Sequence, residues 1–230
     1  MPTGTLVSHG QARAEARASA GRLRAAGSRV ALIACGALAT HAAAAAARHT
    51  PPLPVDVHPL PPLLHNHPQR IAGEVEATID RLAGRYDRVA VGYADCGTYG
   101  ALDALCARRG VERLPGLHCY DLYAGEARVA ALLDEEPGTY LLTDFLVRSF
   151  DRTVWAELGL DRHPGLRDDY FGHYTRCVWL AQDPDPDTDP ELLALARRAA
   201  ARLGLPLQVE RTGTALLDDA LARLVLDPDG

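Results

Sequence analysis

The sequence predicts an α/β fold built from duplicated α/β units, with mostly parallel sheets flanked by helices. Short apolar runs that suit buried strands alternate with longer amphipathic or alanine-rich segments that suit helices. This alternation is typical of parallel sheets, because each strand needs a crossover to reach the next. The duplication is indicated by two segments that echo each other, RVALIACG at residues 29–36 and RVAVGYADCG at residues 88–97.

The first half of the chain contains four predicted strands and three predicted helices. The strands are apolar runs at residues 30–34, 55–58, 89–93 and 111–114. The helices are an alanine-rich stretch at 37–49, a stretch at 69–82 with one apolar stripe, and residues 99–109. Several prolines between residues 59 and 68 predict a loop without helix there.

The second half continues the same alternation. A helix is expected at 124–133, followed by a strand at 139–143 and a helix at 145–158, which Thr143 and Asp144 can cap. Strands at 176–182 and 207–211 flank a helix at 190–203, and a last helix is expected at 214–224. We therefore expect an N-terminal helical extension at residues 1–27 and one duplicated α/β domain at 28–230, with a subdivision near 137–160 as an option.

Composition and charge exclude several classes of function. The 230 residues carry a net charge of −6, so no general attraction to nucleic acid or to an anionic membrane is expected. All 24 basic residues are arginine, which excludes a lysine-dependent phosphate loop and Schiff-base chemistry. The start of the chain does not resemble a signal peptide, and no apolar run is long enough to span a bilayer. We expect a cytoplasmic protein.

Three of the five cysteines follow predicted strands, where parallel sheets build their sites. Cys35, Cys96 and Cys119 occupy such loops, so we expect them to meet at one edge of the sheet. The alternative is that each is a small buried apolar residue, a common fate of free cysteine. Cys106 within a helix and Cys177 within a strand are expected to belong to the core.

Polar residues near these cysteines are the further candidates for a site. We expect acid–base or supporting roles for His65, His118 and Asp95. We expect contacts with a substrate from Asn66, Thr98, Tyr120, Asp144, Arg162 and Arg167. For Asp144, a helix cap is the competing interpretation. The segment at 159–174, which contains both arginines, is either an anion-binding lid over the cysteines or a solvated connection.

These motifs resemble one family of uncharacterised proteins. CGAL at residues 35–38, LPPLLHN at 60–66, GYADCGT at 92–98 and LPGLHCY at 114–120 are similar to the family called domain of unknown function 1638. TDFL at 143–146, LGLDRHP at 158–164 and YFGHY at 170–174 extend the similarity over about residues 28–215. The resemblance implies an association with corrinoid-dependent methyltransferases. A looser similarity, to quinolinate synthase, implies repeated α/β units that each lend a loop cysteine to a [4Fe-4S] cluster.

Three hypotheses about function follow. The first is a metal-dependent enzyme, a lyase or transferase, in which Cys35, Cys96 and Cys119 hold a [4Fe-4S] cluster or, alternatively, zinc. It would act on a small anionic or sulfur-containing metabolite, and a corrinoid protein or methyltransferase would be its partner. The second is a non-catalytic accessory or binding protein of a corrinoid methyltransferase system. The third is a metal-free enzyme with Cys96 or Cys119 as nucleophile, activated by His118 or His65.

Overall fold

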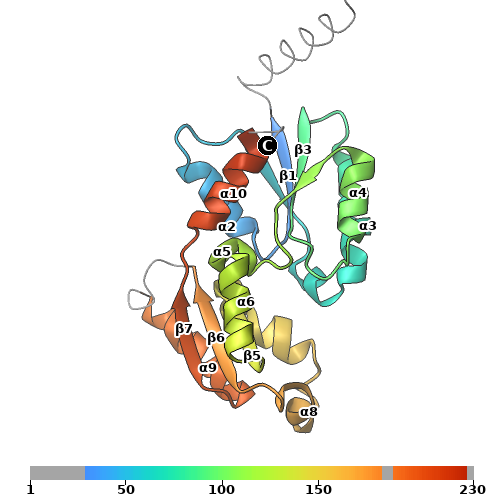
Figure 1. The fold of residues 1–230 in the computed structure, drawn as a ribbon. Coiled ribbons are helices and arrows are strands. Elements are labelled where there is room, and N and C mark those ends of the chain that lie inside the picture. The colour runs from blue at the N-terminus through green and yellow to red at the C-terminus, as the bar shows by residue number, and fades with distance from the viewer. Residues whose placement is uncertain (1–28, 183–188, 227–230) are drawn as a thin grey trace, which may run out of the picture.

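The computed structural model describes residues 29–182 and 189–226. These residues form two parallel sheets covered by helices (Figure 1). This confirms the predicted α/β class. The expected extension at residues 1–27 lies outside the described residues. None of the described helices combines the length and apolar character needed to cross a bilayer.

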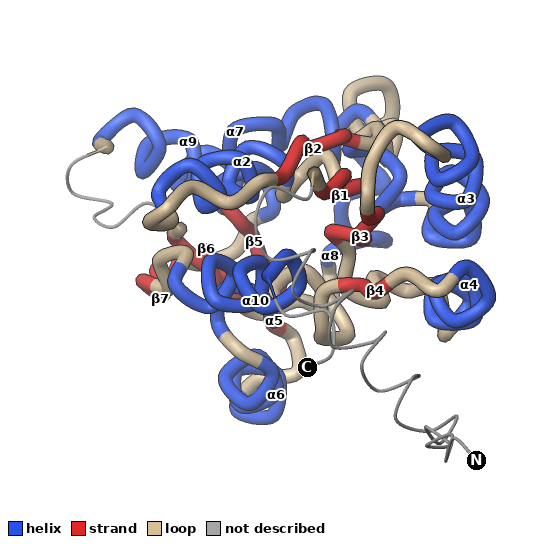
Figure 2. The backbone as a smooth tube through the Cα atoms, turned by 90° about the horizontal axis from the view of Figure 1, so that it is seen from above, coloured by secondary structure: helices blue, strands red, loops and turns tan. Residues whose placement is uncertain are grey.

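The first sheet has the strand order β2-β1-β3-β4, and all its pairs are parallel (Figure 2). Its strands are β1 (Val30–Ala34), β2 (Val55–Pro59), β3 (Arg88–Gly92) and the two-residue β4 (Glu112–Arg113). The two echoing segments are therefore the neighbouring central strands β1 and β3. Their last residues, Ala34 and Gly92, are register partners, so the loops that follow start side by side.

Helices cover the first sheet on both faces. On one face, α2 (Ala39–Arg48) packs against α10 (Ala215–Leu226), and on the other, α3 (Ile71–Leu82) packs against α4 (Ala101–Arg109) (Figure 1). The chain thus leaves β1 toward one face and β3 toward the opposite face. In a parallel sheet, such a point opens a crevice between the two loops, where ligands bind.

The second sheet has the order β5-β6-β7 and is also parallel throughout. Its strands and flanking helices are β5 (Thr139–Thr143), β6 (Arg176–Ala181), β7 (Leu207–Arg211), α6 (Glu126–Glu135), α7 (Asp144–Phe150) and α9 (Pro190–Leu203). Side chains of β6 alternate between two cores: Cys177 and Trp179 pack with α7 and α9, whereas Val178 packs with α6. Both faces of this strand are buried, and its residues are apolar from Cys177 to Ala181.

Several predicted boundaries differ from the observed ones. The proline-rich segment contains two 3-10 turns, Pro62–Asn66 and Pro68–Arg70, because proline is tolerated as the first residue of a turn. The helix expected at 145–158 is α7 followed by a π-helical turn, Asp151–Ala156. A short helix, α5 (Asp121–Ala124), precedes α6, and α8 (Arg167–Phe171) lies within the expected lid segment.

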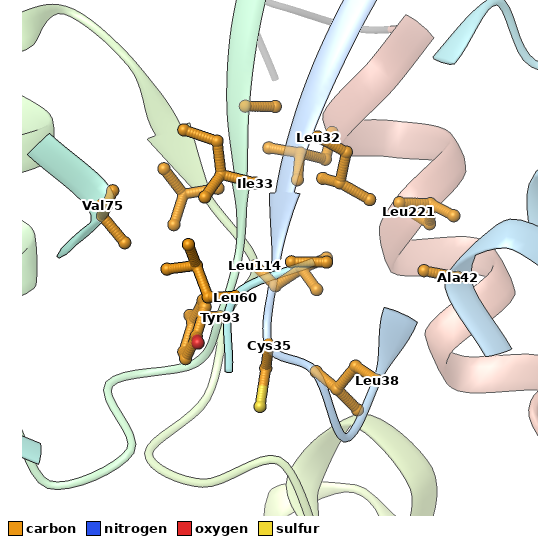
Figure 3. Close-up of a cluster of buried hydrophobic side chains, with 14 of the residues drawn as sticks. Leu32, Ile33, Cys35, Leu38, Ala42, Leu60, Val75, Tyr93, Leu114 and Leu221 are labelled. Atoms are coloured by element: carbon orange, nitrogen blue, oxygen red, sulfur yellow. The ribbon is translucent and has the colours of Figure 1, made fainter. Parts of the chain in front are cut away.

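The loop after β1 packs tightly against the segment that follows β2. Figure 3 shows Cys35 directly beyond the arrowhead of β1, near Leu38 and Tyr93. A Cβ atom on Gly36 would overlap the carbonyl oxygen of Leu60 and lie 2.9 Å from the nitrogen of Pro62. Glycine is required at this position because two backbone segments approach each other there.

Replacing Gly36 with alanine tests this close approach. We expect Gly36→Ala to lower the free energy of unfolding by about 1–3 kcal/mol, since backbone must shift to make room for the methyl group. Urea denaturation measures the change. Gly73→Ala in α3 is the matched control: an added Cβ there meets nothing within 4 Å. It should stabilise the protein by about 0.5–1 kcal/mol. Equal effects of the two changes would contradict the packing argument.

Candidate functional site

A cavity of about 150 Å³ lies where the carboxyl end of the first sheet meets the second sheet. It is several times larger than the space one water molecule needs. Its lining residues are Cys35, Ala37, His65, Tyr93, Cys96, His118, Cys119, Tyr120, Thr143 and Leu146. The three cysteines singled out from the sequence thus share one cavity, which we call the cysteine cavity. Thr143 comes from the end of β5 in the second sheet, and Leu146 comes from α7, which follows it.

Main-chain hydrogen bonds bring the three cysteines together. The amide of Cys35 donates to the carbonyl of Gly92 over 3.1 Å, which extends the pairing of β1 and β3 by one residue. The amide of Cys96 donates to the carbonyl of Leu117 over 2.7 Å. Because Leu117 lies two residues before Cys119, this second bond ties the loop after β3 to the loop after β4.

Asp95 and Thr98 organise the loop after β3 and do not line the cysteine cavity. The Asp95 carboxylate accepts hydrogen bonds from the Thr98 hydroxyl at 2.6 Å and from the amides of Tyr99 and Gly100 at 3.1 and 3.0 Å. Burial raises the pKa of Asp95, but these hydrogen bonds outweigh it and leave the pKa below its usual value. Asp95 and Thr98 thus have a scaffolding role in this loop, and the roles expected for them in catalysis and substrate binding stay predictions.

Two residues of this loop have left-handed backbone conformations that are uncommon for residues other than glycine. The φ angle is 51° at Cys96 and 52° at Tyr99. Such conformations cost free energy, and they persist only where surrounding contacts enforce them. The hydrogen bonds of Asp95 and of the Cys96 amide are those contacts.

The thiols of Cys96 and Cys119 interact directly. A hydrogen bond from the Cys119 thiol to the Cys96 sulfur lowers the pKa of Cys96 and, with burial, raises that of Cys119. Burial raises the pKa of Cys35 to about 11, although the amides of Ala37 and Leu38 donate to its sulfur. Among the three cavity thiols, Cys96 therefore has the strongest thiolate character.

Tyr93 is a cavity residue that the sequence analysis missed. Its side chain is only 1% exposed, and its hydroxyl has no hydrogen-bond partner among the described residues. The Cys35 thiol lies beside it, in a geometry short of a hydrogen bond. Buried hydroxyls without partners are rare, so this one is available to hydrogen-bond a water molecule or a bound group. The signal in the sequence was a single phenol at the end of an otherwise apolar strand.

Two histidines face the cysteine cavity. The Nδ1 atom of His65 lies 2.6 Å from the carbonyl oxygen of Pro62, which can only accept, so Nδ1 carries the proton. In the neutral ring, Nε2 is then the acceptor. His118 is exposed and stacks on Tyr120 with 6.4 Å between ring centroids. Both imidazoles line the cavity, and the acid–base or supporting roles expected for them stay predictions.

A second cavity of about 270 Å³ adjoins the first and shares His65, Tyr120 and Leu146 with it. We call it the aromatic cavity, because its other lining residues include Tyr140, Tyr170, Phe171 and Tyr174. Asn66 also lines it, and its amide nitrogen donates to the carbonyl of Thr153 over 3.1 Å. Two predicted substrate contacts, Asn66 and Tyr120, thus lie at these cavities.

Asp144 lies near the end of β5 but is not a lining residue of either cavity. It is 2% exposed, and its carboxylate accepts from the Trp179 indole at 2.8 Å and from the amide of Gln182 at 3.1 Å. Thr143, and not Asp144, caps α7: its hydroxyl accepts a hydrogen bond from the amide of Leu146. The Asp144 carboxylate instead joins β5 to β6.

The arginines expected to bind an anion are not lining residues of either cavity. Arg162 is exposed and lies 3.8 Å from a carboxylate oxygen of Asp161. Arg167 forms an ion pair of 2.5 Å with Asp168. The segment at 159–174 contributes its aromatic residues to the aromatic cavity, whereas its arginines lie elsewhere on the surface.

The scaffolding role of Asp95 predicts a specific dependence on pH. The folded-state pKa is lowered, so the stabilisation is present above the unfolded pKa of about 3.9 and is lost as pH falls through the folded value. We expect Asp95→Ala to be less stable than the parent at neutral pH, with the difference shrinking below about pH 4. Urea denaturation across this range measures it. Asp134→Ala, at an exposed position of α6, is the control and should show no such convergence.

The thiol pair predicts an order of chemical reactivity. In metal-free, reduced protein at neutral pH, iodoacetamide should modify Cys96 before Cys35, because the thiolate is the nucleophile and Cys35 is buried with a raised pKa. Cys119→Ala should slow the modification of Cys96 several-fold by removing its hydrogen-bond donor. Peptide mass spectrometry follows each site, and Cys106→Ala is the control. Faster labelling of Cys35 would contradict the assignment.

Comparisons with known proteins agree with the motifs from residue 60 onward, whereas the CGAL motif at 35–38 lies outside the match. One family model, described as "Protein of unknown function (DUF1638)", matches residues 59–221, which is more than half of the chain. Neither the curated proteins nor the solved structures contain a match. The matched region includes Cys96, Cys119, both cavity histidines and the whole second sheet. The chain is a member of the DUF1638 family.

Proposed function

We propose that the protein is a cytoplasmic metal-dependent enzyme in which Cys35, Cys96 and Cys119 hold a [4Fe-4S] cluster. The main support is that three thiols from three strand ends line one small cavity. The same cavity contains two imidazoles and the buried Tyr93 hydroxyl without a partner. Soft thiolates are the donors that iron–sulfur clusters and zinc prefer.

The choice of a cluster over a single ion rests on the looser similarity to quinolinate synthase. Within residues 29–182 and 189–226, no three His, Cys, Asp or Glu side chains are arranged to hold one metal ion. A cluster binds each cysteine through a different iron, so its cysteine sulfurs lie farther apart than three ligands of one zinc ion. The Cys96 and Cys119 thiols interact directly, so the two side chains would have to move apart to hold a cluster, and zinc is the alternative.

A cluster with three cysteine ligands has one iron open, which acts as a Lewis acid toward a substrate oxygen or sulfur. The surrounding side chains would handle protons and orientation. His65 would use Nε2 as an acid–base group, since Nδ1 is held by Pro62. His118 would act at the exposed side of the cavity, and Tyr93 would donate a hydrogen bond to the bound group.

The lining residues bear on the class of substrate. Among the described residues, no arginine lines the cysteine cavity or the aromatic cavity, so these residues do not provide the guanidinium that usually binds a carboxylate or phosphate. We therefore favour a sulfur-bearing or uncharged metabolite over an anionic one. An association with corrinoid-dependent methyl transfer, as an enzyme or as an accessory protein with structural cysteines, rests on the family resemblance alone.

One observation favours a second candidate function, a metal-free enzyme with Cys96 as nucleophile. The pKa of Cys96 is lowered by the hydrogen bond from Cys119, and low thiol pKa values are typical of reactive cysteines. His118 and His65 line the same cavity and could accept the thiol proton. This candidate requires Cys96 but gives Cys35 no role.

Metal content distinguishes these functions. After anaerobic reconstitution with iron and sulfide, we expect the parent protein to bind a cluster, visible in its absorption spectrum and iron content. Cys35→Ala, Cys96→Ala and Cys119→Ala should each lose most of the iron, because each removes one ligand.

Cys106→Ala and Cys177→Ala are the controls, because both cysteines are buried in the cores, 6% and 0% exposed. They should retain the iron. Equal iron in all five variants, or none in the parent, would sink the cluster proposal. Stoichiometric zinc in place of iron would support the alternative metal.

A further inference from the structure

We propose that the aromatic cavity binds an apolar, uncharged part of the substrate while the reacting end reaches the cysteine cavity. This inference deepens the proposed function, on which it rests for the identity of the reacting end. It assigns the class of ligand to a part of the site for which the sequence predicted an anion.

The lining of the aromatic cavity supports a ligand without negative charge. None of its described lining residues has a carboxylate or guanidinium group, and five of them have aromatic rings of phenylalanine or tyrosine. Burying an anion beside apolar rings without a cationic partner is costly. The polar groups of the lining are those of His65, Asn66 and Thr153 and the tyrosine hydroxyls, which suit hydrogen bonds to a neutral ligand.

The rings form a preorganised wall. Tyr140 contacts Phe171 edge to face with centroids 5.4 Å apart and Tyr174 in the same manner at 5.2 Å. Edge-to-face pairs at these separations are favourable, so the rings hold one another in place before a ligand arrives. A volume of about 270 Å³ accommodates one small ring compound.

The two cavities are arranged as two ends of one site. His65, Tyr120 and Leu146 line both, so a ligand in the aromatic cavity lies directly next to the cysteine cavity. His65 lines both ends, and its Nε2 is the acceptor of the neutral ring. The position of this nitrogen suits a polar group at the junction, between the apolar part of a substrate and its reacting end.

A matched pair of probes tests the inference on the full chain without added metal. 4-Methylphenol and 4-hydroxybenzoate have similar shapes, but the second carries a carboxylate where the first carries a methyl group. Ligand-observed NMR or calorimetry should show saturable binding of 4-methylphenol, and binding of 4-hydroxybenzoate at least tenfold weaker. Equal or tighter binding of 4-hydroxybenzoate, or no binding of either probe, would overturn the proposal.

Variants locate the bound probe. Leu158→Trp fills the aromatic cavity and should remove binding, whereas Leu166→Trp, at a 39% exposed position that lines neither cavity, should leave it unchanged. Tyr170→Ala removes a 42% exposed ring at the cavity and should weaken binding several-fold without disturbing the core. Binding unaffected by both Leu158→Trp and Tyr170→Ala would place the probe elsewhere and overturn the assignment.

The outcome is independent of the proposed cluster. Cys96→Ala should lose iron while it retains 4-methylphenol, because Cys96 lines only the cysteine cavity. A protein that binds the probe but no metal would retain the substrate assignment and lose the cluster. If the protein binds iron but not the probe, the cluster proposal stands and the substrate assignment is wrong.

Discussion

The parallel pairing of β1 with β3 is the constraint on which the site depends. It aligns Ala34 with Gly92, and the bond from the Cys35 amide to the Gly92 carbonyl continues the pairing into the loops. From that point the chain leaves toward opposite faces of the sheet, so the loops separate and a crevice opens. The close approach at Gly36 and the bonds from the Asp95–Cys96 segment to the Gly116–Leu117 segment then close its sides.

Carboxylates near the site serve the scaffold. Asp95 accepts hydrogen bonds from its own loop, and Asp144 accepts one from a side chain of the neighbouring strand. A partly or fully buried carboxylate requires such donors, because burying a charge without them is costly. The cavity is consequently left to thiols, imidazoles and phenols. The cavity therefore offers soft ligands and neutral groups that can carry a proton. The negative charges of Asp95 and Asp144 lie outside its lining.

The sequence predicted the backbone well and the directions of side chains less well. Strands such as β1 and β6 are buried on both faces, so their apolar runs are continuous and easy to recognise. Cys35, Cys96 and Cys119 could be placed at the cavity because a residue just past a parallel strand lies at a known edge. The histidines and Tyr120 followed from the same reasoning.

Other positions could not be derived in this way. Whether Asp95 and Asp144 face a cavity or a backbone amide depends on donors supplied by the fold, and pattern alone does not reveal these. Arg162 and Arg167 were expected over the cysteines because they are close in sequence to aromatic residues. In the structure the aromatic residues of this segment line the aromatic cavity, whereas its arginines line neither cavity. Tyr93 could not be identified from the sequence, because what marks it is a buried hydroxyl without a hydrogen-bond partner among the described residues. Only the folded structure reveals that.

The left-handed backbone at Cys96 has a consequence for the sequence itself. Glycine adopts a φ of 51° without penalty, so the most relaxed residue for that position would have no side chain. The chain instead has a cysteine there, whose sulfur lies in contact with a second thiol. Strain of this kind is retained where a side chain does something that the stability of the fold does not require. On this criterion, the backbone at position 96 agrees with the role proposed for Cys96, and selection for thermal stability alone would favour glycine at this position.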